Sequence, residues 1–346
     1  MAERWVTLPI DAERRPPWLG DREVRIPETL ARGPLDLDAA IDALESESWA
    51  PPMTTVTTKV PFAYDRLPAR LRGLAATALM GALRVTRARR DPPWPIAPTL
   101  DVLRALRGDP VSVWPGDKRW ALLPTVDVDS VAGLRRAPLL AEIAERRRIK
   151  LTYFIVGEAH EREPGIVGEL RSRGHSIGSH DLRHDNQLAY LPPRERDDRL
   201  RRAKDLIERL GGDGFRSPSL IRSPALREAV AKHFAWDASV CDTDLEFERG
   251  VCTVHPFRRW GALQVPITLP MESSLSYTLR GPDAVLQVWK DKCAWIRTVG
   301  GLATLAVHAE PHLSGGRRYR GAFERFLDWA LEQPDLAIVT PRDLRA

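Results

Sequence analysis

Strand and helix patterns alternate along this chain from about residue 119 to the C-terminus. Residues 120–128 and 151–156 are apolar, β-branched runs typical of buried strands, and residues 131–148 between them carry apolar side chains at helical spacing. This alternation indicates βαβ units and a parallel sheet. Further strands are expected over 234–241 and 262–268. Seven or eight such strands over roughly 230 residues favour a closed or nearly closed (β/α) barrel over an open sheet.

The residues before the barrel have a different pattern. Residues 1–115 are irregular and rich in proline, with helices expected over 36–45 and 67–90. In the second of these segments, arginines flank a nearly apolar centre at 74–83. A helix packed on the barrel is one interpretation, and an interfacial helix whose arginines reach anionic headgroups is the other. We therefore expect an N-terminal extension over 1–115 and a barrel over 116–346.

Composition narrows the class of protein. Hydrophobic residues make up 43% of the 346, enough for a full core, and the net charge is only +5. The basic residues are mostly arginines spread along helical patterns, which argues against nucleic-acid binding. The three cysteines form no C-x-x-C pair, and no apolar run approaches the roughly 20 residues of a membrane span. We expect a cytoplasmic protein, with residues 67–90 as a candidate contact with the inner membrane face.

Two pairs of polar residues follow predicted strands with the spacing of a metal site. Asp127 and Asp129 are two apart at the end of a strand, so both carboxylates point to the same side. His180 and His184 are four apart, and they would share one face if this segment were helical. One carboxylate and two imidazoles form a cation site with open positions, as catalytic zinc requires.

Other polar residues complete a hydrolytic set. Arg216, Asp242 and His308 also lie at predicted strand ends, where a (β/α) barrel gathers its active site. A second Asp can accept a proton from water, an arginine can hold that Asp ionised, and a separate histidine can protonate a leaving amine. With a cation that polarises the carbonyl, this set predicts hydrolysis of an amide or ester.

Other interpretations of the same residues stay open. A D-x-D motif also holds the metal of a nucleotide sugar in glycosyltransferases. Two histidines and a carboxylate also bind iron in oxygenases, although those sites usually lie on double-sheet β folds. A non-enzymatic alternative is a metal-free barrel that docks partners through its first 115 residues.

Four motifs, T-V-D-V-D, S-H-D-L-R-H, F-R-S-P-S and V-H, resemble those of the polysaccharide deacetylase family, the NodB-homology carbohydrate esterases. The resemblance covers about two-thirds of the chain, from residue 119 to 346. It implies a distorted (β/α)7 barrel and a divalent metal, Zn2+ or another cation such as Co2+, Ni2+ or Mn2+. The roles it implies are Asp127 as base, Asp129, His180 and His184 as metal ligands, Arg216 as tether of the base, His308 as general acid, and the backbone N–H of Ser219 as oxyanion donor.

The chain also departs from the family pattern. One residue is inserted between the two aspartates, as in a minority D-x-D branch. The fourth family motif is poorly matched, and we choose Asp242 over Asp244 as the partner of His308. Three further positions differ from the usual residue: Asp181 replaces Ser or Thr, Ser219 replaces an aromatic residue, and Ala306 replaces a Leu that packs against the acyl methyl.

The predicted function is removal of an N-acyl group, first of all N-acetyl, from an amino sugar of a polysaccharide or glycolipid. Q-V-P-I-T-L-P and V-H-A-E are similar to segments of deformylases that act on a lipid-linked formamido sugar, which is one alternative substrate. An allantoinase-like hydrolase of a small amide is another. The sequence carries no signal for an oligomeric state.

Overall fold

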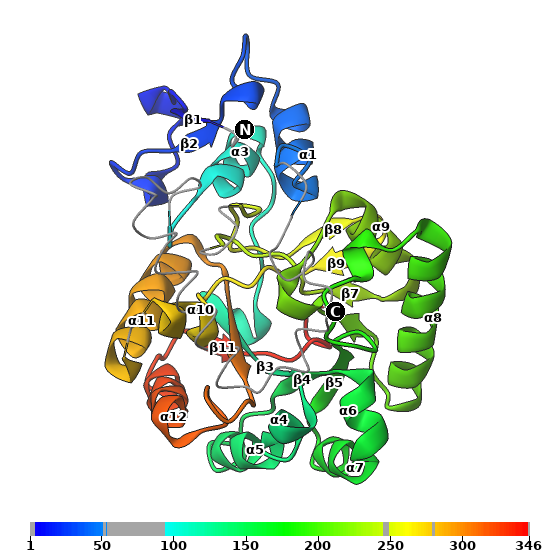
Figure 1. Ribbon diagram of the computed structural model, residues 1–346. Coiled ribbons are helices and arrows are strands. Elements are labelled where there is room, and N and C mark those ends of the chain that lie inside the picture. Colours follow the sequence, from blue (N-terminus) through cyan, green and yellow to red (C-terminus); the bar gives the residue numbers. More distant parts are fainter. Residues whose placement is uncertain (1–3, 51–52, 54–93, 245–248, 279–280, 345–346) are drawn as a thin grey trace.

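The computed structural model describes residues 4–50, 53, 94–244, 249–278 and 281–344. Its centre is a curled sheet in which neighbouring strands run in the order β10-β3-β4-β5-β6-β7-β9-β8, while β11 also pairs with β3 (Figure 1). The strands are β3 (Trp120–Val128), β4 (Thr152–Ile155), β5 (Ser176–Ser179), β6 (Gly214–Phe215), β7 (Trp236–Asp237), β8 (Phe257–Arg259), β9 (Ala262–Gln264), β10 (Leu302–His308) and β11 (Leu336–Ile338).

Every pairing in this sheet is parallel except that of β8 with β9. The segment that follows β9 approaches β10, and so it narrows the gap between the two ends of the curled sheet. The backbone N–H of Leu269 donates to the carbonyl of Thr304 at 3.2 Å, and the hydroxyl of Thr268 donates to the carbonyl of Leu302 at 2.7 Å. The predicted distorted (β/α) barrel is therefore confirmed.

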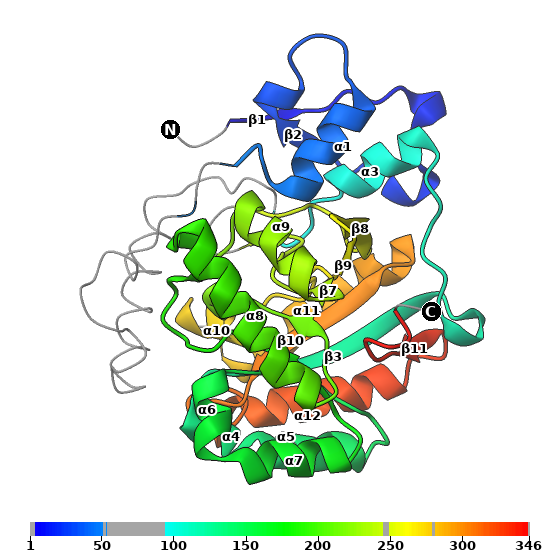
Figure 2. The same cartoon turned by 90° about the vertical axis from the view of Figure 1, so that its right-hand side faces the viewer.

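Helices surround this sheet on its outer side (Figures 1 and 2). Buried apolar residues of the strands and of the inner helix faces form the main core between them. The helices are α4 (Val131–Leu134), α5 (Ala137–Glu145), α6 (Gly157–Arg162), α7 (Pro164–Ser172), α8 (Pro193–Arg209), α9 (Pro224–His233), α10 (Glu272–Tyr277), α11 (Pro282–Val299) and α12 (Arg317–Leu331). Short 3-10 turns lie at 115–117, 188–190 and 218–220.

Two sequence predictions were wrong in detail. The single helix expected over 131–148 is split into α4 and α5, because Pro138 has no backbone N–H to continue the helical ladder. The strand expected over 234–241 is reduced to β7. There the Asp237 carboxylate accepts the backbone N–H of Ser239 at 2.9 Å, a local bond that interrupts the regular ladder, and pairing resumes as an isolated bridge between Cys241 and Ile267.

The N-terminal region (described residues 4–50 and 94–114) packs on one side of the barrel (Figure 2). It contains the antiparallel strands β1 (Trp5–Thr7) and β2 (Arg25–Pro27), the helices α1 (Leu37–Ser46) and α3 (Thr99–Arg107), and 3-10 turns at 12–14, 17–19 and 28–30. The Asp36 side chain caps α1 by accepting the backbone N–H of Ala39. The apolar core is continuous from this region into the barrel, so a domain boundary near residue 115 stays a prediction.

The predicted helix over 67–90 lies outside the described residues, and its contact with a membrane is untested. Among the helices that are described, none has the length and apolar character that crossing a bilayer would require.

Candidate metal centre and active site

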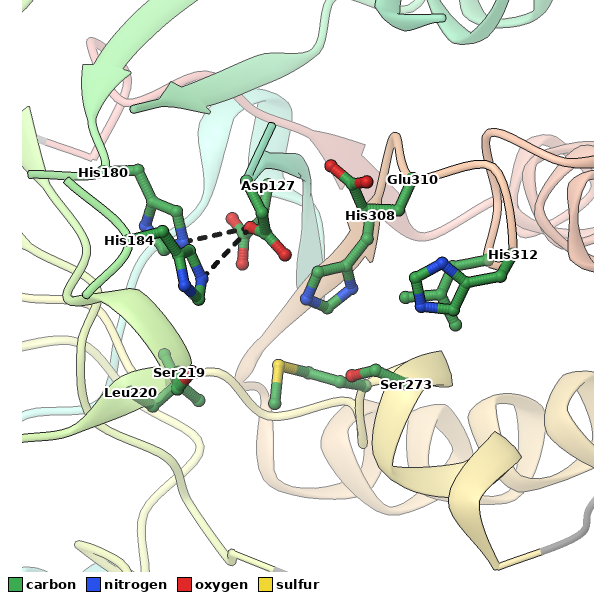
Figure 3. Close-up of a pocket in the computed structure, with 12 residues that line it drawn as sticks. Asp127, His180, His184, Ser219, Leu220, Ser273, His308, Glu310 and His312 are labelled. Atoms are coloured by element: carbon green, nitrogen blue, oxygen red, sulfur yellow. Dashed lines mark ion pairs between the residues drawn. The ribbon is translucent and has the colours of Figure 1, made fainter. Parts of the chain in front are cut away.

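Three predicted metal ligands converge at the carboxyl ends of β3 and β5. Oδ1 of Asp129 lies 3.4 Å from Nε2 of His180 and 3.6 Å from Nε2 of His184. One ligand atom from each residue lies within 4.8 Å of the other two. Figure 3 shows the two imidazoles pointing toward the carboxylates of the β3 end.

The segment that carries the two histidines is an irregular loop after β5, which corrects the helical geometry considered from the sequence. Asp181 within it has a φ of 65°, in the left-handed region that interrupts a helix. The two imidazole centroids are nevertheless 5.5 Å apart. Nδ1 of His180 lies 2.8 Å from the carbonyl of Arg216, and this contact leaves Nε2 facing Asp129.

An arginine on α8 holds this loop together. The Arg199 guanidinium donates to the carboxylate of Asp181 at 2.9 Å, to both oxygens of Asp185 at 2.8 and 2.9 Å, and to the carbonyl of Arg183 at 3.0 Å. Asp181 is one of the departures from the family pattern, and here it is the residue that ties the loop to α8. No sequence motif marks Arg199.

The donor set fits a divalent cation. The buried Oδ1 of Asp129 has no hydrogen-bond partner among the described residues, and two imidazole nitrogens face it. Burial raises the pKa of Asp129, but the nearby charges of His184, His308 and His180 hold it well below its usual range. Asp129 is therefore a carboxylate at neutral pH, and one carboxylate with two imidazoles is a set that zinc and similar cations accept with open positions.

Asp127 lies beside this centre and is held by an arginine. It is 2% exposed, and Nη1 of Arg216 donates to its Oδ1 at 2.6 Å. The same nitrogen donates to the hydroxyl of Thr125 at 2.9 Å, while the guanidinium stacks 4.1 Å above the ring of Phe154. These contacts fix the guanidinium in place, so that it orients the carboxylate of Asp127.

His308 faces the same pocket from β10 (Figure 3), and in the sheet it is paired with Asp127 of β3. Its partner is Glu272, the first residue of α10. Oε2 of Glu272 lies 3.1 Å from Nδ1 of His308, and Oε1 accepts the backbone N–H of His308 at 2.6 Å. Burial lowers the pKa of His308, but Glu272, with smaller contributions from Asp129 and Asp127, raises it to about 10. His308 is therefore protonated at neutral pH in the metal-free protein.

The prediction that Asp242 partners His308 was wrong. The Asp242 carboxylate accepts a hydrogen bond from the buried ammonium of Lys292 on α11. Asp244 lies 3.5 Å from Arg222 instead. A buried carboxylate must be compensated, and the strand end that carries Asp242 meets Lys292 rather than the histidine.

The pocket joins these groups and is lined by residues from several loops. Ser219 lies in its wall, as predicted, within the turn that follows Arg216. Glu310, which stands in the V-H-A-E motif, is a pocket residue that was not predicted from the sequence. Glu310 is 2% exposed and accepts hydrogen bonds from the Ser130 hydroxyl at 2.9 Å. The lining residues are Asp127, Asp129, His180, His184, Ser219, Leu220, Met271, Ser273, His308, Glu310, His312 and Leu313.

Part of this chain is similar in sequence to known deacetylases. The family model described as polysaccharide deacetylase matches residues 125–234. A peptidoglycan-N-acetylglucosamine deacetylase of Bacillus cereus is 30% identical over 96 residues, which are 28% of this chain and 34% of that protein. The matched stretch thus spans about a third of the length of this relative.

Solved structures share the fold. A putative polysaccharide deacetylase from Mycobacterium smegmatis aligns with a TM-score of 0.55 at 21% identity, over 66% of this chain and 88% of that chain. A probable polysaccharide deacetylase from Pseudomonas aeruginosa PAO1 aligns with a TM-score of 0.54 at 19% identity, over 67% and 91%. Puue allantoinase aligns with a TM-score of 0.56 at 18% identity, over 67% and 90%.

Proposed function

We propose that this chain is a divalent-metal-dependent hydrolase that removes an N-acyl group from an amino sugar. The match of residues 125–234 to the polysaccharide deacetylase family and the similarity to a peptidoglycan-N-acetylglucosamine deacetylase support this proposal. Acetyl is the first acyl group to test, and a polysaccharide or glycolipid is the proposed substrate. The name of the Bacillus cereus relative supports N-acetylglucosamine as the first sugar to test.

One observation carries this proposal. The three-residue donor set of Asp129, His180 and His184 shares one pocket with a carboxylate held by arginine and a histidine held by glutamate. A structural metal site would not need a separate base and acid beside it. Hydrolysis of an amide does need both, because water must lose a proton and the amine must gain one.

The roles follow from the contacts of each side chain. Asp127, oriented by the hydrogen bond from Arg216, would accept the proton of the attacking water. His308, kept protonated by Glu272, would donate a proton to the leaving amine. The backbone N–H of Ser219 would donate to the carbonyl oxygen as negative charge develops on it. A divalent cation held by Asp129, His180 and His184 would supply Lewis-acid polarisation of the carbonyl and a lower pKa for water.

The test combines metal content with product release. Elemental analysis compares the wild type with the His180→Ala/His184→Ala double variant. The metal-loaded protein is then incubated with an N-acetylglucosamine oligomer, and released acetate and free amine are measured. We expect about one divalent ion per chain, lost in the variant, and acetate release only by the loaded wild type.

Other outcomes would redirect or overturn the proposal. Hydrolysis of allantoin but of no amino sugar would make the substrate a small amide. Release of formate from a formamido sugar, without acetate from the oligomer, would make the enzyme a deformylase. The absence of stoichiometric metal, even after reconstitution, would contradict the hydrolase mechanism and favour a docking role for the barrel.

A further inference from the structure

A carboxylate from the N-terminal region is buried among three arginines of the barrel. Glu47 follows the last residue of α1, and it is 1% exposed. Its two oxygens accept hydrogen bonds from Nε and Nη2 of Arg222 at 2.6 and 2.7 Å. Arg249 and Arg227 lie 3.5 and 3.7 Å from the same carboxylate. Together with Asp244 of the barrel, 3.5 Å from Arg222, this one anion of the N-terminal region thus compensates a concentration of buried positive charge.

Arg222 connects this carboxylate to the wall of the pocket. Its guanidinium, which is completely buried, also donates from Nη1 to the carbonyl of Leu220 at 3.0 Å. Its backbone N–H contacts the sulfur of Met53 at 3.4 Å. Arg222 therefore links two parts of the N-terminal segment, Glu47 and Met53, with the turn that lines the active-site pocket.

That turn has a conformation that its own residues disfavour. Ser219 and Leu220 have φ angles of 50° and 53°, in the left-handed region where a side chain crowds the backbone. Both residues line the pocket. Such a conformation persists where the surroundings impose it. Two side chains hold carbonyls of this turn: the Ser217 hydroxyl donates to Ile221 at 2.6 Å, and Arg222 donates to Leu220. Backbone bonds from Leu220 to Ser217 and from Ile221 to Pro218 close the turn itself.

We infer that Glu47 is a positioning residue for the active site. It orients Arg222, which holds the carbonyl of Leu220 and so keeps the pocket wall of residues 217–222 in its left-handed turn. The N-terminal region would then complete the pocket as well as stabilise the fold. Glu47 lies outside residues 125–234, to which the family match is confined. The catalytic consequence rests on the proposed function, whereas the effect on the conformation of the wall does not.

The first test measures the wall directly and needs no substrate. Hydrogen–deuterium exchange is followed in the peptide covering 216–223 for wild type, Glu47→Gln and Glu45→Gln. Glu45 is a matched control, because it lies two residues earlier, on α1, and pairs with Arg104 and Arg259, away from the pocket wall. Each protein is measured at the same interval below its own melting temperature. We expect exchange in 216–223 to rise about tenfold or more in Glu47→Gln only, and exchange at 180–184 to stay unchanged.

The second test measures catalysis with metal content as an internal control. Glu47→Gln should bind divalent metal with the stoichiometry of the wild type, because the proposed metal ligands lie outside the pocket wall of residues 217–222. Its kcat/KM for the N-acetylglucosamine oligomer should fall about 10- to 100-fold below that of Glu45→Gln, since small misplacements at a site carry costs of that size. Glu47→Asp, which restores the charge opposite Arg222, should recover part of this loss.

The exchange measurement tests the role of Glu47, and the activity measurement tests the proposed function. If Glu45→Gln and Glu47→Gln show equal exchange in 216–223, the inference is overturned, whatever the catalytic activity of the two variants. A wild type that binds metal but hydrolyses no amino sugar would end the proposed function, while the exchange result would still decide the role of Glu47. Should Glu47→Gln fail to fold, Arg222→Lys takes its place, because a lysine ammonium cannot bridge both partners. Wild-type exchange and kcat/KM in that variant would overturn the inference.

Discussion

Glu272 holds His308 by two contacts at once: Oε1 accepts the backbone N–H at 2.6 Å, and Oε2 faces Nδ1 at 3.1 Å. The glutamate thus fixes both the end of β10 and the plane of the imidazole. With Nδ1 committed to this contact, the other ring nitrogen is the one available to the pocket. The charge of the carboxylate also decides the protonation state of the histidine, since its coulombic effect is the largest influence that opposes burial.

Glu272→Gln should move the alkaline limb of the pH–kcat profile to lower pH. The amide can still accept the backbone N–H of His308, but it removes the charge that raises the pKa of the imidazole to about 10. His308 then loses its proton at a lower pH, and activity that needs the protonated acid falls earlier as pH rises. At alkaline pH the loss should reach about 10²-fold, the lower end for a positioned acid.

An NMR titration of the metal-free protein checks the same shift without substrate. The His308 resonance should titrate near pH 10 in the wild type and clearly lower in Glu272→Gln. Glu310→Gln serves as the comparison, because that pocket carboxylate is bonded to Ser130. An unchanged His308 pKa in Glu272→Gln would contradict this role.

Asp127→Asn should bind metal normally and lose activity by about 10²–10⁴-fold. The amide cannot accept a proton from water, whereas Asp129, His180 and His184 stay in place to hold the cation. Metal content and the initial rate of acetate release are measured together. Asp291→Asn, an exposed change on α11, is the control. Full activity in Asp127→Asn would exclude Asp127 as the base.

Arg199→Ala should weaken divalent-metal binding about 10- to 100-fold, the usual cost of removing a group that orients metal ligands. Arg199 bonds Asp181, Asp185 and the carbonyl of Arg183, which surround the two histidines along the loop. The metal dissociation constant is measured by competition with a chelator. Arg201→Ala is the matched control, because Arg201 lies on the same helix and pairs with Asp198 at the surface. Equal affinities of the two variants would show that the loop holds its shape without Arg199.

Glu47 should make the protein more stable at neutral pH than in acid. Burial raises the pKa of Glu47, but Arg222 and Arg249 lower it from 4.5 to about 2. A carboxylate whose pKa is lower in the folded than in the unfolded state stabilises the fold at pH values above its unfolded-state pKa. This stabilisation is lost as the pH falls through the folded-state pKa. The shift corresponds to a contribution on the order of 3 kcal/mol.

Thermal unfolding of the wild type and Glu47→Gln between pH 7 and about pH 3 checks this linkage. The difference in melting temperature should be largest at neutral pH and should narrow below about pH 4.5, where unfolded Glu47 takes up a proton. A difference that stays constant across this range would mean that the charge of Glu47 contributes nothing to stability.

The architecture and half of the residues that line the pocket could be predicted from the sequence alone. Apolar runs that alternate with amphipathic segments can bury their faces only as a parallel sheet covered by helices. In such a sheet the carboxyl ends of the strands meet, so polar residues at those ends become neighbours. For this reason the strand-end positions of Asp127, His180, Arg216 and His308 were enough to predict one common site.

Tertiary structure alone decided how the buried charges are paired. Glu272 lies 36 residues from His308, and Lys292 lies 50 residues from Asp242, so no local spacing indicates either pair. Glu47 meets Arg222 across 175 residues. A buried charge requires a partner, but the sequence does not say which of several opposite charges will be nearest once the sheet has curled. That choice depends on long-range packing, and here it gives His308 the partner Glu272 and Arg222 the partner Glu47.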